Sequence, residues 1–394
     1  MTRVRQTTHP DGAIPPIGPS PHVVHVMTRY LRGGSERRLH DMVEALPDAT
    51  HELILGADSL PDKARRDMPL TSVTVVPTLV RAPSPSRDVR ALASIWRILQ
   101  AAAPDLVVTH QSKAGALGRL AARRVHVPTV VSLSMANFGP GYPSLQGAFF
   151  RSLEGRLHPS TSAYAVVGND LARRFERIGV PRTKLHVVRS GVRLPTEPYA
   201  GRRRELRDRL GIPHSRKVLA HIGSLEPRKN VLDLVPLLQD VLDEGPARPF
   251  LAIAGEGPLD VHLERRIRSA GLVGDVVLLG FLEDPLSLIA AADVLILLSS
   301  AEGVSQVLIQ AAALDTPFVA YHVDGVGELR DLGARGREVP LGDRSAAAAA
   351  VREVLSWGPG QGRSSIDLTE WTPEAIRASY RSLFAEALSA APAR

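Results

Sequence analysis

The sequence predicts an α/β fold built from two doubly wound domains, each containing a parallel sheet. Short apolar segments of strand length alternate with amphipathic segments of helical spacing from about residue 22 onwards. The alternation restarts after a segment near residues 192–215, as expected where one domain ends and another begins. Glycine-containing loops follow several predicted strands, which is typical of strand-to-helix turns. We therefore expect two Rossmann-like domains that face a central cleft.

Chain length and local composition suggest the domain boundaries. With 394 residues, the chain is long enough for two domains of ordinary size. Residues 1–21 are rich in Pro and Gly and lack the apolar centre of a signal peptide, so we expect a disordered tail. Residues 22–195 are predicted to form the N-terminal domain and residues 196–372 the C-terminal domain. Residues 373–394 contain a final predicted helix.

In the first half, the predicted strands are short apolar segments that alternate with amphipathic helices. These strands are His22–Met27, Glu52–Leu55, Ser72–Val76, Leu106–Thr109, Thr129–Leu133, Ala163–Val167 and His186–Val188. Helices are predicted between them, from the glycine turn at 33–36 to Leu46, from about Asp88 to Ala102, and from Lys113 to Arg124.

The second half repeats the pattern. Its predicted strands are Val218–Ile222, Phe250–Ala254, Val276–Leu279, Val294–Leu298 and Phe318–Tyr321. Helical segments follow the first two of these strands, and the final helix is predicted from about Pro373 to Ala390. This arrangement of strand, loop and helix predicts a second parallel sheet.

The composition narrows the class of protein. No apolar run approaches the ~20 residues that a membrane-spanning helix needs. Cysteine is absent, which excludes disulfides, thiol nucleophiles and cysteine-based zinc sites and is compatible with a cytoplasmic location. The net charge of +7 favours anionic ligands such as phosphates or an anionic membrane surface. Nucleic acid is the weaker choice, since aromatic residues are only 4% and no nucleic-acid-binding motif occurs.

The segment from Ser299 to Ala313 is the most informative part of the chain. It follows an apolar strand, so Glu302 is expected on the loop that leaves the carboxyl end of that strand. Residues 306–313 then predict a helix whose N–H groups offer a phosphate site, as in other open parallel sheets. Glu302 and Gln310 would hold two hydroxyl-bearing parts of one ligand. Alternatively, Glu302 caps the helix and Gln310 is an incidental residue on the helix surface.

This segment resembles the paired-acid signature of the GT-B glycosyltransferases of family 4, a retaining group that uses nucleotide sugars. Glu302 matches the first acid, which in that family binds the transferred sugar. Gln310 replaces the second acid, which binds the ribose, and an amide can still both donate to and accept from a diol. The resemblance implies a GT-B fold and a final helix that packs back on the N-terminal domain.

Arg228 and Lys229 follow a predicted strand, at the expected start of a helix. A guanidinium forks onto phosphate oxygens and an ammonium adds a point charge, so the pair suits a diphosphate. In family 4 the matching pair stabilises the departing nucleoside diphosphate, which implies catalytic roles for Arg228, Lys229 and Glu302. Alternatively, the two cations are solvated residues at a helix start.

The remaining predicted donor-side residues lie on glycine loops and around the 299–313 segment. The glycine loops resemble family loops beside the donor phosphates and the base, although Ser224 stands where the family often has Arg. As tight turns they would be structural in either case. The residues are Gly33, Gly34, Gly223, Ser224, Gly255, Gly257, Gly303, Val304, Ser305 and Gln306.

Four residues of the first half are candidates for the acceptor side. His110 and Lys113 belong to a stretch similar to those of family members that act on polysaccharide or lipid-linked acceptors. A solvated lysine at a helix start is the alternative for Lys113. Ser134 stands where many relatives have a histidine near the reaction centre, so Ser134 or Asn137 would have to supply the hydrogen bond to the transferred sugar.

The sequence therefore predicts a retaining, metal-independent glycosyltransferase that moves a hexose or N-acetylhexosamine from a nucleoside-diphosphate sugar, with UDP favoured. No Asp-x-Asp motif occurs, so no metal or other cofactor is expected. The hydroxyl acceptor is a glycan, a lipid-linked sugar or a small molecule. We expect a cytoplasmic protein with peripheral contact to an anionic membrane as one option. A sugar-nucleotide epimerase of the same fold and a noncatalytic sugar-nucleotide-binding protein are the alternatives.

Overall fold

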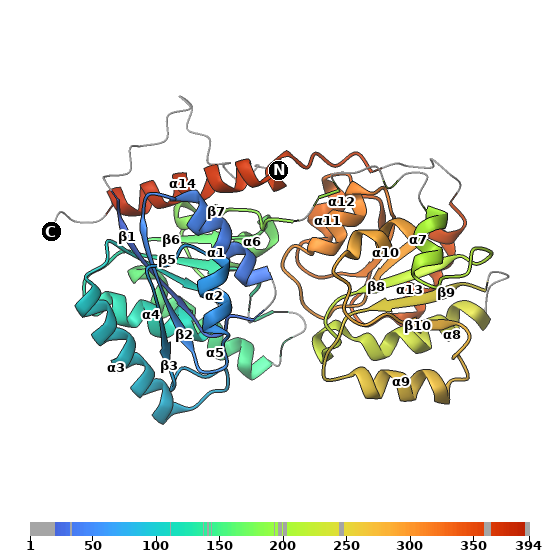
Figure 1. The fold of residues 1–394 in the computed structure, drawn as a ribbon, viewed down its shortest axis with the longest axis horizontal. Helices are drawn as coiled ribbons and strands as arrows, with labels where there is room; N and C mark the ends of the chain where they lie inside the picture. Colours follow the sequence, from blue (N-terminus) through green and yellow to red (C-terminus); the bar gives the residue numbers. More distant parts are fainter. Residues whose placement is uncertain are drawn as a thin grey trace. The chain divides into compact units, whose positions relative to one another are not determined.

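The structure is a computed structural model. It describes residues 20–31, 34–110, 112–136, 138–139, 142, 144–192, 194–195, 199, 203–243, 248–357 and 364–390. The chain divides into two compact units. Unit 1 contains residues 1–191 and 369–394, and unit 2 contains residues 192–368. Each unit is a parallel sheet with helices on both faces, so the predicted α/β class with two Rossmann-like domains is confirmed (Figure 1).

Unit 1 contains a parallel sheet with the strand order β3-β2-β1-β4-β5-β6-β7. The strands are β1 (His22–Met27), β2 (Thr50–Gly56), β3 (Ser72–Val76), β4 (Leu106–His110), β5 (Thr129–Leu133), β6 (Ala163–Val166) and β7 (Leu185–Val187). The helices are α1 (Gly34–Ala45), α2 (Pro61–Asp67), α3 (Pro85–Ala102), α4 (Ser112–Arg124), α5 (Ser144–Leu157), α6 (Asn169–Glu176) and α14 (Pro373–Ser389).

The two faces of this sheet are covered by different helices. On one face, Val23, Val108 and Val130 pack with Met42 of α1 and with residues of α14, including Phe384. On the other face, residues of α3 and α4 cover β1 and β4. Helix α14 lies beside α1 and also contacts β5 and β6, so the last helix of the chain completes the core of unit 1 (Figure 1).

The start of α14 follows from its sequence. Pro373 occupies the first turn, where a missing N–H costs nothing, and the Thr372 hydroxyl accepts a hydrogen bond from the Ala375 N–H at 3.3 Å. Ile376, Tyr380, Leu383, Phe384 and Ala387 then recur at helical spacing and are all buried. The apolar stripe is what attaches this segment to unit 1.

Unit 2 contains a second parallel sheet, with the order β10-β9-β8-β11-β12-β13. Its strands are β8 (Val218–Ile222), β9 (Phe250–Ala254), β10 (Val276–Leu278), β11 (Val294–Leu297), β12 (Phe318–Tyr321) and β13 (Gly336–Val339). Its helices are α7 (Arg203–Arg209), α8 (Leu234–Asp243), α9 (Asp260–Ser269), α10 (Pro285–Ala291), α11 (Gln306–Ala313), α12 (Val326–Asp331) and α13 (Arg344–Leu355).

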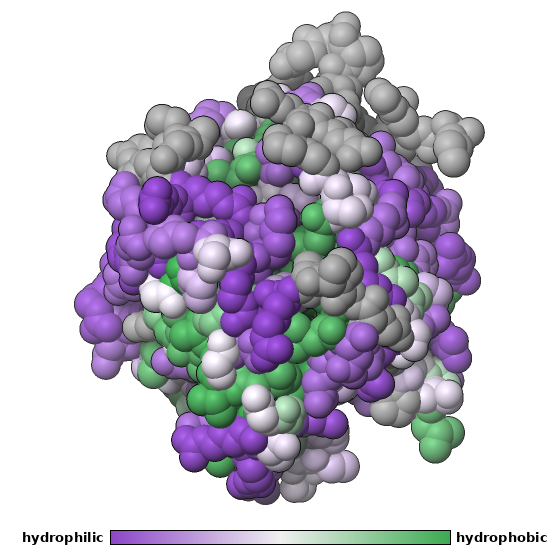
Figure 2. Space-filling model, turned by 90° about the vertical axis from the view of Figure 1, so that its right-hand side faces the viewer, coloured by the Kyte–Doolittle hydropathy of each residue, from purple (hydrophilic) through white to green (hydrophobic). Residues whose placement is uncertain are grey.

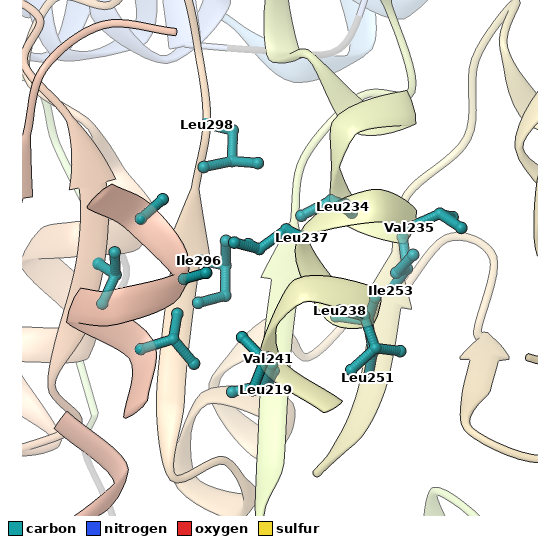
Figure 3. Packing of buried hydrophobic residues seen from close by; sticks show 14 of the residues in the cluster. Leu219, Leu234, Val235, Leu237, Leu238, Val241, Leu251, Ile253, Ile296 and Leu298 are labelled. Carbon is teal, nitrogen blue, oxygen red and sulfur yellow. The ribbon is translucent and has the colours of Figure 1, made fainter. Parts of the chain in front are cut away.

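The core of unit 2 is aliphatic. Leu237 and Val241 of α8 pack against Leu219 of β8 and Ile296 of β11, and α13 extends the same cluster (Figure 3). Burial of each such side chain contributes roughly 1.5–3 kcal/mol. This packing holds β8 and β11, the strands that precede the candidate site, in one rigid layer.

The surface is mixed. Figure 2 shows a face on which hydrophilic residues surround smaller hydrophobic areas. Large apolar side chains that are exposed include Leu145 and Phe149 on α5 and Val261, Val273 and Phe281 in unit 2. Among the residues that the structure describes, none of the helices combines the length and apolar character needed to cross a bilayer.

Candidate functional site

The candidate site in unit 2 lies where the strand order changes direction. From β8 the chain adds β9 and then β10 along one edge of β8. It then returns to the opposite edge of β8, where β11 pairs. β8 pairs with β9 along its whole length but with β11 only at Leu219 and Ala220. The loops that leave β8 and β11 therefore begin at the point where parallel sheets typically bind ligands.

The loop after β8 is not the helix start that we expected. Pro227–Lys229 forms a single 3-10 turn, a second such turn spans Val231–Asp233, and α8 begins only at Leu234. Asn230 separates the two turns with a left-handed backbone, φ 47°. Asparagine tolerates this conformation better than most residues. Arg228 and Lys229 are thus carried by a short turn whose path is set by Asn230.

Hydrogen bonds join this turn to the loop after β11. The Arg228 carbonyl accepts from the Ser300 N–H at 2.8 Å and from the Ser300 hydroxyl at 3.1 Å. The Arg228 Nη1 donates to the Ala301 carbonyl at 2.7 Å, and the Asn230 Nδ2 donates to the Leu298 carbonyl at 2.9 Å. Backbone and side chain together therefore hold the two loops in a fixed register.

This register brings Glu302 against the two cations. The Lys229 Nζ lies 2.5 Å from the Glu302 Oε1, and the Arg228 Nη1 lies 3.5 Å from the same oxygen. Arg228 also donates to Glu226 at 2.8 Å. The side chains of Lys229 and Glu302 are only 14% and 11% exposed, whereas that of Arg228 is 31% exposed. The three predicted catalytic residues are thus brought together.

The electrostatics of the cluster favour an ionised Glu302. Burial by itself raises the pKa of this carboxyl, but Lys229 and then Arg228 more than offset that effect and hold its pKa below the ordinary value. A diphosphate would compete with Glu302 for both cations, because charge-assisted hydrogen bonds to phosphate are strong. The cluster can therefore exchange one anion, the carboxylate, for another.

The segment after Glu302 is positioned by close backbone packing. Gly325 has φ +82°, and a Cβ at this position would lie 2.1 Å from the Gly303 carbonyl oxygen. The loop of Gly303 and Val304 therefore packs directly on the start of α12. Ser305, which is buried, immediately precedes α11. Gln306 is the first residue of α11, and Gln310 lies one turn further and is buried.

The predicted glycine loops of unit 2 have structural reasons for their glycines. Gly255 has φ +138°, and a Cβ there would lie 1.8 Å from the Gly223 carbonyl oxygen. A Cβ at Gly257 would lie 2.5 Å from the carbonyl oxygen of Leu225. The two loops therefore lie against each other. Within the loop after β8, the Ser224 hydroxyl donates to Glu226 at 3.0 Å, and Glu226 in turn accepts from Arg228.

The predicted donor- and acceptor-side residues of unit 1 fall in different environments. Gly33 and Asn137 lie outside the described residues, and Gly34 is the first residue of α1. Ser134 follows β5 and is half-buried. Lys113, at the start of α4, donates to Asp88 at 2.7 Å and to the Ala82 carbonyl. The structure thus gives Lys113 an ion-pair partner within unit 1.

His110 is buried at the end of a chain of three histidines. His51 Nε2 lies 3.0 Å from the Leu46 carbonyl, His51 Nδ1 lies 3.1 Å from His25 Nε2, and His25 Nδ1 lies 3.3 Å from His110 Nε2. Because a carbonyl only accepts, the neutral rings must each carry their proton on Nε2. The His110 Nδ1 is then a lone-pair acceptor, and it is buried with no hydrogen-bond partner among the described residues.

These three histidines are neutral at physiological pH. Burial lowers the pKa of His25 well below its ordinary value, with His51 and His110 adding to the effect. Burial, with a smaller contribution from Arg38, lowers the pKa of His110 to about 3. Burial also lowers the pKa of His51, although its bond to Leu46 opposes the shift. The acceptor-side prediction for His110 therefore concerns an uncharged, buried ring.

Sequence reasoning missed two features of the unit 2 site. One is the set of hydrogen bonds by which Asn230 and Ser300 join the two loops. Polar side chains in turns are common, so the sequence has no pattern that distinguishes these two. The other is His221, the polar residue in the apolar strand β8, which is fully buried two residues before Gly223. A polar side chain inside a buried strand was the available signal. In the described parts of both units, no group of three or more His, Asp or Glu side chains is arranged to hold a metal ion.

Comparison with known proteins adds a family to this geometry. The profile described as glycosyl transferase 4-like domain matches residues 33–191, and the profile described as glycosyl transferases group 1 matches residues 202–363. Together the two profiles cover most of the chain, and their boundary falls between the two units.

Relatives of known name are similar over different lengths. A UDP-Gal:alpha-D-GlcNAc-diphosphoundecaprenol alpha-1,3-galactosyltransferase from Escherichia coli is 27% identical, over 77% of this chain and 80% of its own. The N-acetyl-alpha-D-glucosaminyl L-malate synthase of Bacillus anthracis is 28% identical, but over 38% of this chain and 39% of its own. An alpha-D-kanosaminyltransferase from Streptomyces kanamyceticus is 30% identical over 39% of this chain and 40% of its own.

Solved structures share the fold. Anabaena HepE, in complex with UDP and glucose, has a TM-score of 0.72 at 21% identity and covers 94% of this chain and 100% of its own. WaaG, a glycosyltransferase involved in lipopolysaccharide biosynthesis, has a TM-score of 0.67 at 17% identity and covers 90% of this chain and 94% of its own.

Proposed function

The chain belongs to the family 4 glycosyltransferases of the GT-B fold, and from this premise we propose that it transfers a hexose or N-acetylhexosamine from a UDP-sugar to a hydroxyl group. The chain is an enzyme, a glycosyltransferase. The UDP donor is supported by the name of the Escherichia coli relative and by the UDP bound in the HepE structure. The three relatives described above are named as transferases or as a synthase, which favours transfer over epimerisation.

One observation carries the proposal: Arg228, Lys229 and Glu302 meet at the switch point of unit 2. Arg228 and Lys229 stabilise the negative charge that develops on the leaving diphosphate. Glu302 accepts hydrogen bonds from hydroxyls of the transferred sugar, and Gln310 binds the ribose. These cations take the place that a divalent metal fills in other nucleotide-sugar enzymes, so we propose that transfer is metal-independent.

We propose transfer with retention. The bond between the anomeric carbon and the diphosphate oxygen breaks while the acceptor oxygen bonds to the same face of that carbon. The acceptor proton moves to the diphosphate oxygen that departs. The diphosphate thus leaves protonated, and Arg228 and Lys229 neutralise its remaining charge.

A lipid-linked acceptor at an anionic membrane in the cytoplasm is the acceptor class that the surface of unit 1 favours. Leu145 and Phe149 lie four residues apart on α5 and are 88% and 63% exposed. Arg151 and Arg156 on the same helix are also exposed. Exposed apolar side chains among arginines suit the boundary of a bilayer with anionic headgroups. Pelleting with anionic but not with neutral vesicles is the expected result, and equal recovery with both would contradict it.

Thermal unfolding with UDP, GDP, ADP and TDP, each with and without EDTA, tests the donor proposal. A ligand at ~100 times its Kd stabilises the folded state by about 2.7 kcal/mol, which is a readable shift. We expect UDP to raise the unfolding temperature equally with and without EDTA. Stabilisation by a different nucleotide would correct the donor, and stabilisation that EDTA abolishes would contradict metal independence. The absence of any shift at saturating nucleotide would remove the basis of the proposal.

A further inference from the structure

His221 is a fully buried polar residue in an otherwise apolar strand. Its Nδ1 lies 3.1 Å from the Ile296 carbonyl oxygen of β11. The carbonyl can only accept, so Nδ1 carries the proton of the neutral ring and Nε2 carries the lone pair. Nε2 is buried and has no hydrogen-bond partner among the residues that the structure describes. A buried acceptor without a partner is costly, which calls for an explanation at this position.

The unpartnered nitrogen and the end of Lys229 lie against the same glycine, Gly223. A Cβ placed on Gly223 would lie 3.6 Å from the His221 Nε2 and 3.6 Å from the Lys229 Cε. The imidazole and the end of the lysine therefore converge on the space that a side chain at residue 223 would fill. In the present arrangement the Lys229 ammonium is directed at Glu302, at 2.5 Å.

The environment keeps the imidazole uncharged. Burial lowers the pKa of His221 to about 4; the bond to the Ile296 carbonyl opposes this shift, Lys229 adds to it, and Glu302 opposes it. Apart from Lys229 and Glu302, the charged groups of this cluster are Arg228 and its partner Glu226. At neutral pH the lone pair on Nε2 can therefore accept a hydrogen bond.

In the donor complex proposed above, the hydroxyls of the sugar compete with Lys229 for hydrogen bonds to Glu302. When Glu302 turns to the hydroxyls of the sugar, Lys229 loses its nearest acceptor in a largely buried position. An ammonium has three N–H donors, and the diphosphate approaches it from one side, so a donor that faces the protein interior still needs an acceptor. That acceptor should carry no net charge, because a second carboxylate would repel the diphosphate.

We propose that His221 is a positioning residue for Lys229. Its Nε2 accepts the hydrogen bond that Glu302 releases, and it holds the charged ammonium directed at the diphosphate. The inference rests on the proposed function, since it assigns His221 to the same site. Gly223 contributes to this arrangement, because a Cβ there would contact both the His221 Nε2 and the Lys229 Cε at 3.6 Å.

Two amide substitutions separate this role from simple packing. The amide of asparagine matches the Nδ1 position, so His221→Asn can keep the bond to Ile296 but lacks the acceptor that faces Lys229. The longer glutamine reaches the Nε2 position, so His221→Gln can supply that acceptor. We expect His221→Asn to lower kcat about 10- to 100-fold with the donor KM within about threefold, the pattern of an interaction made in the transition state. His221→Gln should recover about tenfold of the lost kcat.

The controls distinguish this inference from the proposed function. His126→Asn, at an exposed histidine of unit 1, should leave both kinetic constants unchanged. A purely structural role predicts that both His221 amides lower stability and activity alike, and this result would overturn the inference. A kcat for His221→Asn within about twofold of the wild type would do the same. If the wild-type chain transfers no sugar, the proposed function fails instead.

A measurement on the unmodified chain is available if the variants do not fold. In ¹⁵N spectra of histidine-labelled protein, His221 should show a protonated Nδ1 and an unprotonated Nε2. Addition of saturating UDP-glucose, whose sugar hydroxyls would engage Glu302, should move the Nε2 resonance toward the position of a hydrogen-bonded nitrogen. A resonance that does not move, in a sample where UDP-glucose raises the unfolding temperature, would contradict the inference while leaving donor binding intact.

Discussion

The switch points of the two sheets have the same topology, but uncharged side chains are in contact at one and charged side chains at the other. In unit 1, β1 and β4 meet at His25 and His110, two buried rings that are uncharged at neutral pH. In unit 2, β8 and β11 lead to Lys229 and Glu302, a largely buried ion pair with Arg228 beside it. The doubled fold therefore supplies two corresponding positions, with neutral histidine rings in contact at one and an ion pair at the other.

The use of buried arginine shows the same contrast. Arg38 of α1 is fully buried and donates to Ser132 and to the carbonyls of Val188 and Ala165. All of these partners belong to unit 1, so its charge serves to join strands. Arg228 of unit 2 remains partly exposed beside Lys229. The comparison shows that the buried guanidinium of unit 1 is fully engaged within its own unit, whereas Arg228 leaves part of its side chain exposed, as the proposed contact with a diphosphate requires.

Removal of the two cations of the unit 2 site should have the largest effect on activity, because it abolishes the charge that distinguishes this site from the unit 1 position. We expect Arg228→Ala combined with Lys229→Ala to lower kcat by at least about 1,000-fold, because two charge-assisted contacts to the leaving diphosphate are lost. The fold should persist, since the aliphatic core of unit 2 does not include these residues. Steady-state kinetics and circular dichroism measure the two effects.

The chain offers a matched control at the other end of the same strand. Arg216 and Lys217 form an identical dipeptide before β8 and pair with Asp275 and Asp293. Alanine at both positions should lower the unfolding temperature and leave kcat within about threefold of the wild type. Comparable losses of kcat in the two double variants would remove the diphosphate role from Arg228 and Lys229.

The neutral histidines of unit 1 should make its stability sensitive to acid. Their folded pKa values are depressed, whereas an unfolded histidine titrates near 6.5, so below about pH 6.5 the unfolded state binds more protons. The stabilisation is present above the unfolded pKa and is lost as pH falls, by ~1.4 kcal/mol per pH unit for each histidine. Removing one of them, with His110→Gln, should reduce this slope by about one proton.

Urea unfolding between about pH 4.5 and 7.5 measures the slope, read from the dependence on pH and not from the absolute stability. His126→Asn is the control, because His126 is exposed and its left-handed backbone suits asparagine. If His110→Gln and the wild type show parallel pH profiles, the histidine chain is not neutral in the folded state and the contrast between the units is smaller than proposed.

The smallest expected effect concerns Gln310. An amide and a carboxylate can each bind a ribose diol, so Gln310→Glu should change the donor KM by no more than about threefold. Gln310→Ala removes the contact and should raise the donor KM about 5- to 20-fold, with kcat changed less. Titration with UDP by calorimetry checks this order. Equal affinity of the wild type and both variants would show that Gln310 does not bind the ribose.

Local sequence was sufficient for the fold class. Apolar segments such as Phe250–Ala254 and Phe318–Tyr321 are strands because consecutive β-branched and aliphatic residues favour a strand buried on both faces. Alternation with helices then implies parallel pairing. Strand β13 was not predicted, since Gly336–Val339 contains glycine, arginine and glutamate and lacks an apolar run. It joins the sheet through its pairing with β12.

The sequence indicated which residues belong to the candidate site, but it did not indicate how the backbone positions them. Arg228, Lys229 and Glu302 were identified from motifs, because chemistry-bearing residues after strand ends are visible in sequence. The 3-10 turn that carries the two cations was mistaken for a helix start, since nothing local shows that the side chain of Asn230 binds the Leu298 carbonyl. A hydrogen bond between residues far apart in sequence decided the local backbone.

The sequence by itself determined the doubled α/β pattern, the glycine turns and the residue types available for phosphate binding, because each depends on neighbours along the chain. Only the tertiary structure decided that Glu302 faces Lys229, that His110 ends a buried histidine chain, and that the His221 Nε2 and the end of Lys229 both lie against Gly223. These contacts depend on strand order and on burial. Both arise when distant segments pack together, and burial then sets which charges persist and which rings stay neutral.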